Sequence, residues 1–267
     1  MNKYLRNWMM NSNVPFLRNI AIRSVRKTHA KRHAAHQQSV YNALYSGNET
    51  PRVLNGPFAG MLYLNEPVWG SITPRWIGCY ERALWPIVND IIKRGYSRVI
   101  DVGCAEGYYA AGLCRALPGV EVFAFDMDPE SQCQLDRLWK LNSSPGNLHI
   151  NGLLDHDGLA SLGISGSLLI CDIEGGEMDL LNPVECPTLT KLDVLVEVHE
   201  TATATVADNV AVLKGRFALS HSVEILPEQR DSQSLQGVHS LSPEALKKAT
   251  SEGRPYEQVW LWMRARD

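Results

Sequence analysis

From residue 98 onward, short apolar runs alternate with longer amphipathic segments. The strand-like runs are rich in β-branched and aromatic residues and occupy 98–102, 120–125, 148–150, 167–171, 192–198, 217–226 and 258–263. Helix-like segments separate them at 108–117, 129–141, 177–181 and 203–214, and another helix begins at 242–244. Strands that are apolar along their length and separated by helices predict an α/β fold. We expect a doubly wound, mostly parallel seven-stranded sheet with helices on both faces.

The first 95 residues do not follow this rhythm. Residues 16–45 form a basic, helix-like stretch, and 53–63 predicts two short strands around a Gly/Pro turn. Residues 74–93 then predict a helix rich in large apolar side chains. We therefore expect two parts, namely an N-terminal helical and hairpin extension over 1–95 that packs on a core domain over 96–267.

Charge divides the chain at a different point. Residues 1–48 contain eight Lys and Arg and no Asp or Glu, which leaves 18 basic and 29 acidic side chains for the remainder. A basic arm of this kind suits nucleic-acid phosphates, an anionic membrane surface or a second copy of the chain. Few aromatic residues are interleaved with its charges and the core is acidic, which disfavours nucleic acid.

Composition also bears on the compartment. The six cysteines form no C-x-x-C pair and most lie in apolar runs, which is typical of reduced thiols. No apolar run reaches the eighteen residues of a membrane-spanning helix, and 11–15 interrupts the core that a signal peptide would need. The prediction is a cytoplasmic protein.

The loop after the first strand reads Asp101-Val102-Gly103-Cys104-Ala105-Glu106-Gly107. In a doubly wound sheet, ligands bind beyond the carboxyl ends of the strands, so this turn faces the site. A dinucleotide needs G-x-G-x-x-G, but the second and third glycines are replaced by Ala105 and Tyr108. Glu106 would also bring negative charge toward a pyrophosphate. A nicotinamide-dependent oxidoreductase is therefore the weaker alternative.

S-adenosylmethionine carries no phosphate and fits the same loop better. Gly103 and Gly107 allow close approach, and Asp101 can reach the ammonium group of the cofactor. Asp126 follows Gly107 by nineteen residues, where an acid that binds ribose hydroxyls is expected, with Asp128 as the alternative. The further predicted cofactor contacts are Cys104, Glu106, Met127, Leu153 against the adenine ring, Asp155 at its amino group, and Asp172.

Acidic residues also follow the fourth and fifth strands. Asp172 and Glu174 come after one strand, and Glu197 and His199 end the next. Parallel strands end at the same edge, so these groups should converge. Neutral His199 could take a proton from a hydroxyl group while Glu197 or Glu174 orients its ring. Alternatively, Asp172, Glu197 and His199 could hold Mg²⁺. Both versions remain open.

At this point the sequence resembles the FkbM family of S-adenosylmethionine-dependent methyltransferases. The resemblance spans about 78–200 and rests on Asp172-Ile173-Glu174-Gly175 with Glu177, on Glu197 with His199, and on Gly78-Cys79-Tyr80-Glu81. The glycine loop departs from the family's Gly-Ala-Asn form.

The resemblance implies O-methylation of a hydroxyl group on a sugar or natural-product acceptor, and it adds Glu81 to the cofactor site. The alternative is an RNA-directed methyltransferase or a non-catalytic adapter that uses the basic arm.

Overall fold

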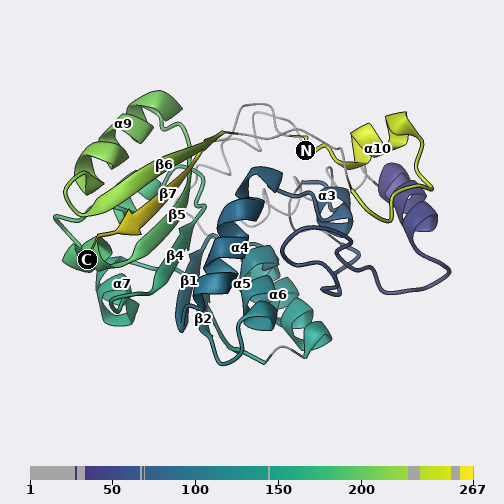
Figure 1. The fold of residues 1–267 in the computed structure, drawn as a ribbon, viewed down its shortest axis with the longest axis horizontal. Coiled ribbons are helices and arrows are strands. Elements are labelled where there is room, and N and C mark those ends of the chain that lie inside the picture. The colour runs from purple at the N-terminus through teal and green to yellow at the C-terminus, as the bar shows by residue number, and fades with distance from the viewer. Residues whose placement is uncertain are drawn as a thin grey trace.

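The computed structural model describes Thr28 and residues 34–66, 68, 70–143, 145–227, 235–253 and 259–266. Within them, seven strands form one sheet in the order β3-β2-β1-β4-β5-β7-β6 (Figure 1). The strands are β1 (Arg98–Val102), β2 (Glu121–Phe125), β3 (Asn147–Asn151), β4 (Leu168–Cys171), β5 (Asp193–Val198), β6 (His221–Pro227) and β7 (Val259–Ala265). The first five are parallel, and β7 runs antiparallel to both of its neighbours, β5 and β6. The predicted fold class is confirmed.

Helices cover both faces of the sheet because apolar residues point both ways from each strand. In β1, Val99 belongs to a buried cluster with residues of the helices at 85–94, 108–116 and 129–142, whereas Ile100 belongs to a second cluster with residues of the helices at 156–162 and 206–217. The helices that follow β1 in the described residues are α5 (Tyr108–Ala116), α6 (Pro129–Asn142), α7 (His156–Leu162), α8 (Glu177–Leu180), η2 (Pro187–Lys191), α9 (Val206–Phe217) and α10 (Pro243–Ala249).

Two differences from the sequence-based expectation concern this part of the chain. Helix α7 is absent from the prediction, and Asp155 caps its N-terminus by accepting a hydrogen bond from Gly158 N. Helix α9 begins later than expected, at a capping box formed by Thr205 and Asp208, and it continues to Phe217. Strand β6 therefore starts at His221 and not at residue 217.

Residues 34–44 are helical, and the earlier part of the predicted 16–45 stretch, apart from Thr28, lies outside the described residues. The predicted 74–93 helix is divided into α3 (Thr73–Ile77), η1 (Arg82–Leu84) and α4 (Trp85–Arg94). The division occurs because Gly78 adopts a left-handed φ of 84° and ends α3, with its Cα packed against Asn55.

The predicted hairpin over 53–63 reduces to a single antiparallel bridge between Arg52 and Leu62. Hydrogen bonds from Val53 N to Met61 O and from Gly60 N to Val53 O close this turn without forming strands. Side chains of the extension, including Val40 and Trp76, nevertheless belong to the same buried cluster as the sheet.

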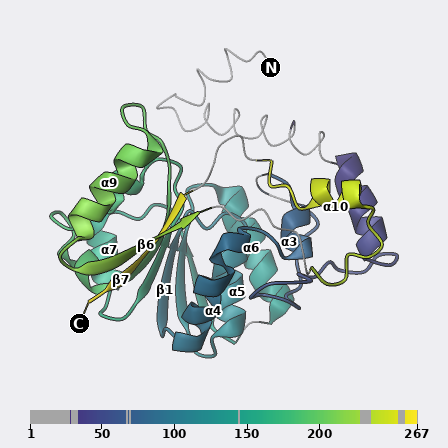
Figure 2. The same ribbon diagram turned by 45° about the horizontal axis from the view of Figure 1, so that its top comes forward.

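The segment between β6 and β7 packs on the N-terminal extension. Asn55 exchanges two hydrogen bonds with Gln236, and the Thr73 hydroxyl donates to Ala249 O at 2.7 Å. Figure 2 shows α10 beside α3 and the helix at 34–44, although these elements are far apart in the sequence. Two distant segments thus build one layer next to the core.

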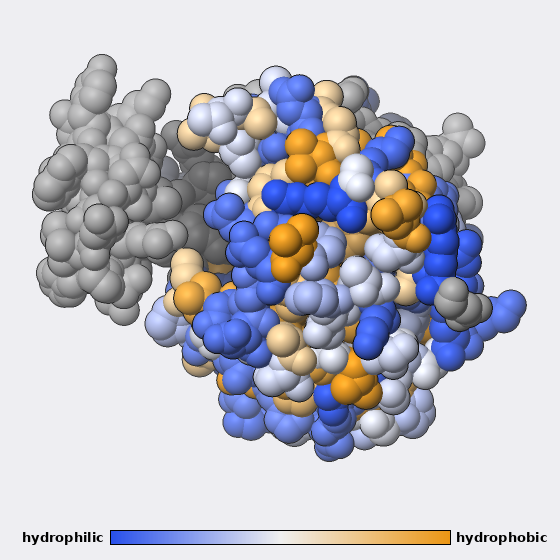
Figure 3. Space-filling model, turned by 90° about the vertical axis from the view of Figure 1, so that its left-hand side faces the viewer, coloured by the Kyte–Doolittle hydropathy of each residue, from blue (hydrophilic) through white to orange (hydrophobic). Residues whose placement is uncertain are grey.

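In the described part of the chain, no helix has both the length and the apolar character that crossing a bilayer requires. On the side of the molecule that carries α9, Figure 3 shows apolar side chains scattered among hydrophilic ones. The exposed large apolar residues of the chain include Val212, within α9, and Leu219, two residues beyond its end.

Candidate active site

The carboxyl ends of the parallel strands share one edge of the sheet. Asp172 N donates to Val102 O at 2.9 Å, which aligns the end of β4 with that of β1. Gly103 N donates to Phe125 O at 2.8 Å, which joins the glycine loop to the end of β2. His199 follows β5 directly, so the predicted groups after four strands meet at this edge.

Gly103 is needed for packing between the loop and β4. Its φ is 82°, and a Cβ atom at this position would lie 1.6 Å from Asp172 O. A larger residue here would therefore collide with the backbone of the protein itself, whether or not a cofactor is bound. Gly107, with φ of 92°, faces Leu135 of α6 in a similar way.

Glu106 was predicted to contact the cofactor, but its carboxylate is buried beside Arg75. Its side chain is 1% exposed, and its Oε1 atom lies 2.8 Å from Arg75 Nε. The Tyr63 hydroxyl donates to the same oxygen at 3.1 Å. The carboxylate is thus held inside the protein beside Arg75, so its charge would not repel a pyrophosphate as the sequence suggested. The glycine spacing still disfavours a dinucleotide.

Asp101 lies in β1 and is almost completely buried. Burial raises its pKa to about 7, with smaller increases from the charges of Asp126 and Glu81 and an opposing hydrogen bond from the Ala110 backbone. A nearby cation would lower this pKa, because the cation favours the ionised form of the carboxyl group.

Asp126 follows β2 and is tied to the glycine loop. Its Oδ2 atom accepts from Ala105 N at 3.0 Å, and its Oδ1 atom accepts from Asp128 N at 2.8 Å. Ala105 itself has a left-handed φ of 46°. The alternative, Asp128, caps α6 by accepting from Glu130 N. Between the two, Asp126 is the residue coupled to the loop.

Two large apolar side chains are exposed after β2 and β3. Met127 is 58% exposed and Leu153 is 74% exposed. Such exposure at the ligand-binding edge suits an aromatic ring that covers both side chains. Asp155 is the N-cap of α7 and is also exposed, whereas Cys104 is buried, with the pKa of its thiol raised by burial.

The segment after β4 folds around the carboxylate of Glu177. Ile173 N donates to Glu177 Oε1 at 3.0 Å, and Gly175 N donates to Glu177 Oε2 at the same distance. The turn requires a left-handed Glu174, with φ of 55°, followed by Gly175 with φ of 105°. Glu177 is 1% exposed, so this carboxylate forms the centre of the turn.

His199 completes the contacts of Glu177. Its Nδ1 atom lies 2.8 Å from Glu177 Oε1, and since an ionised carboxylate only accepts, Nδ1 carries the proton. The sequence pointed to Glu197 or Glu174 for this orienting role, and the structure assigns it to Glu177. The Nε2 atom faces oxygens of Glu174 and Glu197, each at 3.6 Å, and of Asp172 at 3.7 Å.

This pairing changes both pKa values. Burial lowers the pKa of His199, but the hydrogen bond to Glu177 and the charges of Glu197, Glu177 and Glu174 outweigh burial and raise it. For Glu177, burial raises the pKa, and the hydrogen bond and charge of His199 with the backbone donors lower it overall.

A carboxylate cluster adjoins His199. Oxygens of Glu81, Asp172 and Glu197 lie within 4.8 Å of one another, so the structure brings Glu81 to the predicted site. The ligand atoms of Asp172, Glu174 and His199 also lie within 4.8 Å. Each of these sets offers ligand atoms of the kind that a divalent cation binds. The predicted Mg²⁺ set of Asp172, Glu197 and His199 takes members from both.

Sequence reasoning missed three contributors to this geometry. Glu177 was named only as part of the motif that resembles a family, and its contacts follow from the folded turn. The Tyr109 hydroxyl donates to Glu81 Oε2, and Asn209 Nδ2 donates to His199 O at 2.8 Å. Asn209 is a buried polar residue of α9, a pattern visible only once the apolar face of that helix is known.

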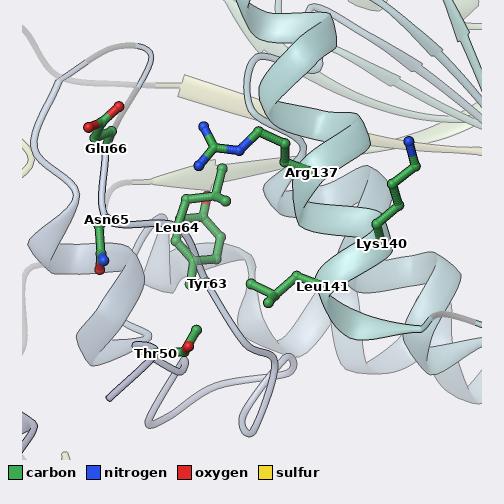
Figure 4. Close-up of a pocket in the computed structure, with 8 residues that line it drawn as sticks. All are labelled: Thr50, Tyr63, Leu64, Asn65, Glu66, Arg137, Lys140 and Leu141. Atoms are coloured by element: carbon green, nitrogen blue, oxygen red, sulfur yellow. The ribbon is translucent and has the colours of Figure 1, made fainter. Parts of the chain in front are cut away.

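A separate pocket of about 600 Å³ lies between residues 50–66 and the second half of α6. Figure 4 shows Arg137 extending from α6 toward Leu64. Arg137 also donates to Gln134 Oε1, and Lys140 pairs with Asp136 at 2.7 Å, so both cations have partners on their own helix. The pocket lies on α6, which leads away from the edge that carries Asp126 and His199.

No known family model matches the chain, and no curated protein matches it. The O-methyltransferase TomG from Streptomyces achromogenes, solved with SAM, is 11% identical and aligns over 67% of this chain and 77% of its own, with a TM-score of 0.45. Magnesium protoporphyrin IX methyltransferase from Synechocystis PCC 6803 is 15% identical over 70% and 80%, with a TM-score of 0.43. An rRNA methylase from Streptococcus thermophilus is 14% identical over 68% and 95%, with a TM-score of 0.41. Likeness of this extent does not decide the reaction, which has to follow from the residues of the site.

Proposed function

We propose that this chain is an S-adenosylmethionine-dependent O-methyltransferase of the FkbM-like kind, acting on a hydroxyl group of a sugar or natural product. The observation that carries the proposal is the contact between His199 Nδ1 and the buried Glu177 carboxylate at 2.8 Å. It leaves Nε2 as the proton acceptor at the edge of the sheet where the glycine loop lies.

The cofactor half of the site is supported by its own residues. The loop from Gly103 to Gly107 lies between β1 and α5, and Asp126 beside it offers acceptors for ribose hydroxyls. Met127 and Leu153 are exposed where an adenine ring would cover them. The acidic edge, including Asp101, suits a ligand that carries sulfonium and ammonium charges.

S-adenosylmethionine, when bound, supplies an electrophilic methyl group on a sulfonium. The residues of this chain supply proton transfer and orientation. As the hydroxyl oxygen forms its bond to the methyl carbon, its proton passes to His199 Nε2. Glu177 stabilises the imidazolium that results, because its carboxylate already accepts from Nδ1. The products are a methyl ether and S-adenosylhomocysteine.

The test has two stages. Calorimetric titration with S-adenosylhomocysteine and with NADH should show binding of the first ligand only. Transfer of labelled methyl groups is then measured with a panel of glycosides and other hydroxyl compounds, with RNA as a separate arm. His199→Ala should lower kcat on the order of a hundredfold, the usual effect of losing a general base, and leave S-adenosylhomocysteine affinity unchanged.

His149→Ala is the matched control. This histidine is exposed on β3 and stacks on Phe123, and its loss should leave turnover unchanged. Equal turnover of wild type and His199→Ala with a true acceptor would refute the role of His199. Label transferred to RNA and not to hydroxyl compounds would favour the RNA-directed alternative.

A further inference from the structure

An ion pair lies beneath the glycine loop and joins it to the N-terminal extension. Glu106 belongs to the loop, whereas Arg75 and Tyr63 precede β1 by more than twenty residues. The Arg75 Nε to Glu106 Oε1 distance is 2.8 Å, and the side chains are 8% and 1% exposed. Tyr63, also buried, donates its hydroxyl to the same oxygen. The proposed mechanism uses none of these three side chains.

Arg75 is held in place by its own surroundings. It lies in α3, its Nη1 atom donates to Ser71 O at 3.1 Å, and its guanidinium carbon lies 4.1 Å from the centre of the Tyr80 ring. Burial lowers the pKa of Arg75, but the charge of Glu106 together with those of Tyr80, Tyr63 and Glu81 outweighs burial and raises that pKa. The arginine therefore presents a fixed, permanent charge to the loop.

The loop that receives this charge has an unfavourable backbone conformation. Ala105 is left-handed without being glycine, and it is flanked by Gly103 and Gly107 at φ of 82° and 92°. Such a conformation persists only when surrounding contacts enforce it. Two contacts lie next to each other here: Ala105 N donates to Asp126 Oδ2, and Glu106 is bound by Arg75.

We propose that Arg75 is a positioning residue for the cofactor, acting through Glu106 on the glycine loop and on the Asp126 carboxylate that the loop binds. This inference rests on the proposed S-adenosylmethionine site. It makes α3 of the extension part of the scaffold of that site. By linkage, cofactor binding in turn stabilises the docking of α3 on the loop.

The experiment measures S-adenosylhomocysteine affinity by calorimetry and kcat at saturating cofactor in the full-length chain. Arg75→Met leaves the Glu106 carboxylate without its counter-charge, and we expect affinity to fall roughly tenfold or more while kcat changes by less than about twofold. Arg75→Lys keeps the charge and should restore part of the loss. Arg98→Met is the matched control, because it breaks an ion pair with Glu121 at the opposite end of β1.

Two milder variants cover the case in which Arg75→Met does not fold. Tyr63→Phe removes one hydroxyl from Glu106 and should weaken affinity roughly threefold. The double variant Arg75→Met with Glu106→Gln contains neither buried charge, and its affinity should lie between those of wild type and Arg75→Met.

The outcomes separate the two ideas. Unchanged affinity in Tyr63→Phe and in whichever Arg75 variants fold would overturn the inference alone. An equal loss of affinity in Arg98→Met would also overturn it, because the effect would then be general destabilisation. A wild-type protein that does not bind S-adenosylhomocysteine would refute the proposed function, and the inference with it.

Discussion

Replacing Glu177 by Gln tests the histidine–carboxylate pair directly. Gln keeps an oxygen that can accept from the Ile173 and Gly175 backbone, but it removes the charge that faces His199. A hydrogen bond to a charged group contributes about 1.5–3 kcal/mol, against about 0.5–1.5 for a neutral one. The midpoints of these ranges differ by about 1.3 kcal/mol, and losing that much stabilisation of the imidazolium corresponds to a roughly tenfold lower kcat.

The pH profile gives a second measurement on the same variant. The pKa of His199 is raised above 6.5 in the wild type, so kcat/KM should increase with pH as His199 loses its proton above that value. Without the charge of Glu177 this acidic limb should move to lower pH. Glu185→Gln is the control, because Glu185 pairs with His156 at 3.2 Å on a different part of the chain.

Thermal unfolding completes the test. A raised histidine pKa contributes stability that is present below 6.5 and lost as pH rises through the folded value. The lowered pKa of Glu177 contributes stability that is present above 4.5 and lost as pH falls through the folded value. Glu177→Gln should therefore lower Tm most between pH 4.5 and 6.5. An unaltered acidic limb together with wild-type kcat would refute the assignment of Glu177.

The remaining predictions concern the loop, the arm and the metal. Asp101→Asn should raise the Tm of the cofactor-free protein at pH 8 but not at pH 4. The pKa of Asp101 is about 7, and its ionised form is unfavourable when buried. Equal effects on Tm at both pH values would contradict this. Gly103→Ala should destabilise the fold by several kcal/mol in urea titrations, through collision with Asp172 O, and a stable variant with selective loss of cofactor affinity would argue otherwise. Removing residues 1–27, which hold six of the eight basic residues in 1–48, should leave S-adenosylhomocysteine affinity intact in calorimetry. Loss of salt-dependent RNA or anionic-vesicle binding would assign a partner to this part of the arm. EDTA should leave turnover unchanged, and recovery of lost turnover by Mg²⁺ would establish the metal-assisted version.

The sheet was accessible from sequence because burial on both faces leaves continuous apolar runs. Val99-Ile100-Asp101-Val102 shows this pattern, and it placed the loop and Asp126 at the correct edge. The extension was harder to predict. Apolar residues continue from Trp76 to Ile91, but Gly78 reverses the backbone because it must pack against Asn55, which is a contact distant in sequence.

In the site too, contacts between residues distant in sequence were harder to predict than the positions of the strands. The positions of Asp172, Glu197 and His199 at the ends of neighbouring strands predicted that they lie together, because that proximity depends on the topology alone. Which carboxylate orients the histidine depends on how the turn closes around Glu177, and the spacing of acids does not reveal that. The pairing of Glu106 with Arg75 likewise joins segments whose contact no local pattern encodes.

The position of β7 has a consequence for biosynthesis. Strand β5, which leads into His199, pairs on one side with β4 and on the other with β7. A ribosome releases β5 well before Val259–Ala265, so the nascent chain exposes an unpaired edge of Val and Leu residues until that strand emerges. An exposed apolar edge of this kind invites pairing with other chains. Until β7 docks, residues 193–198 are therefore open to pairing with another chain.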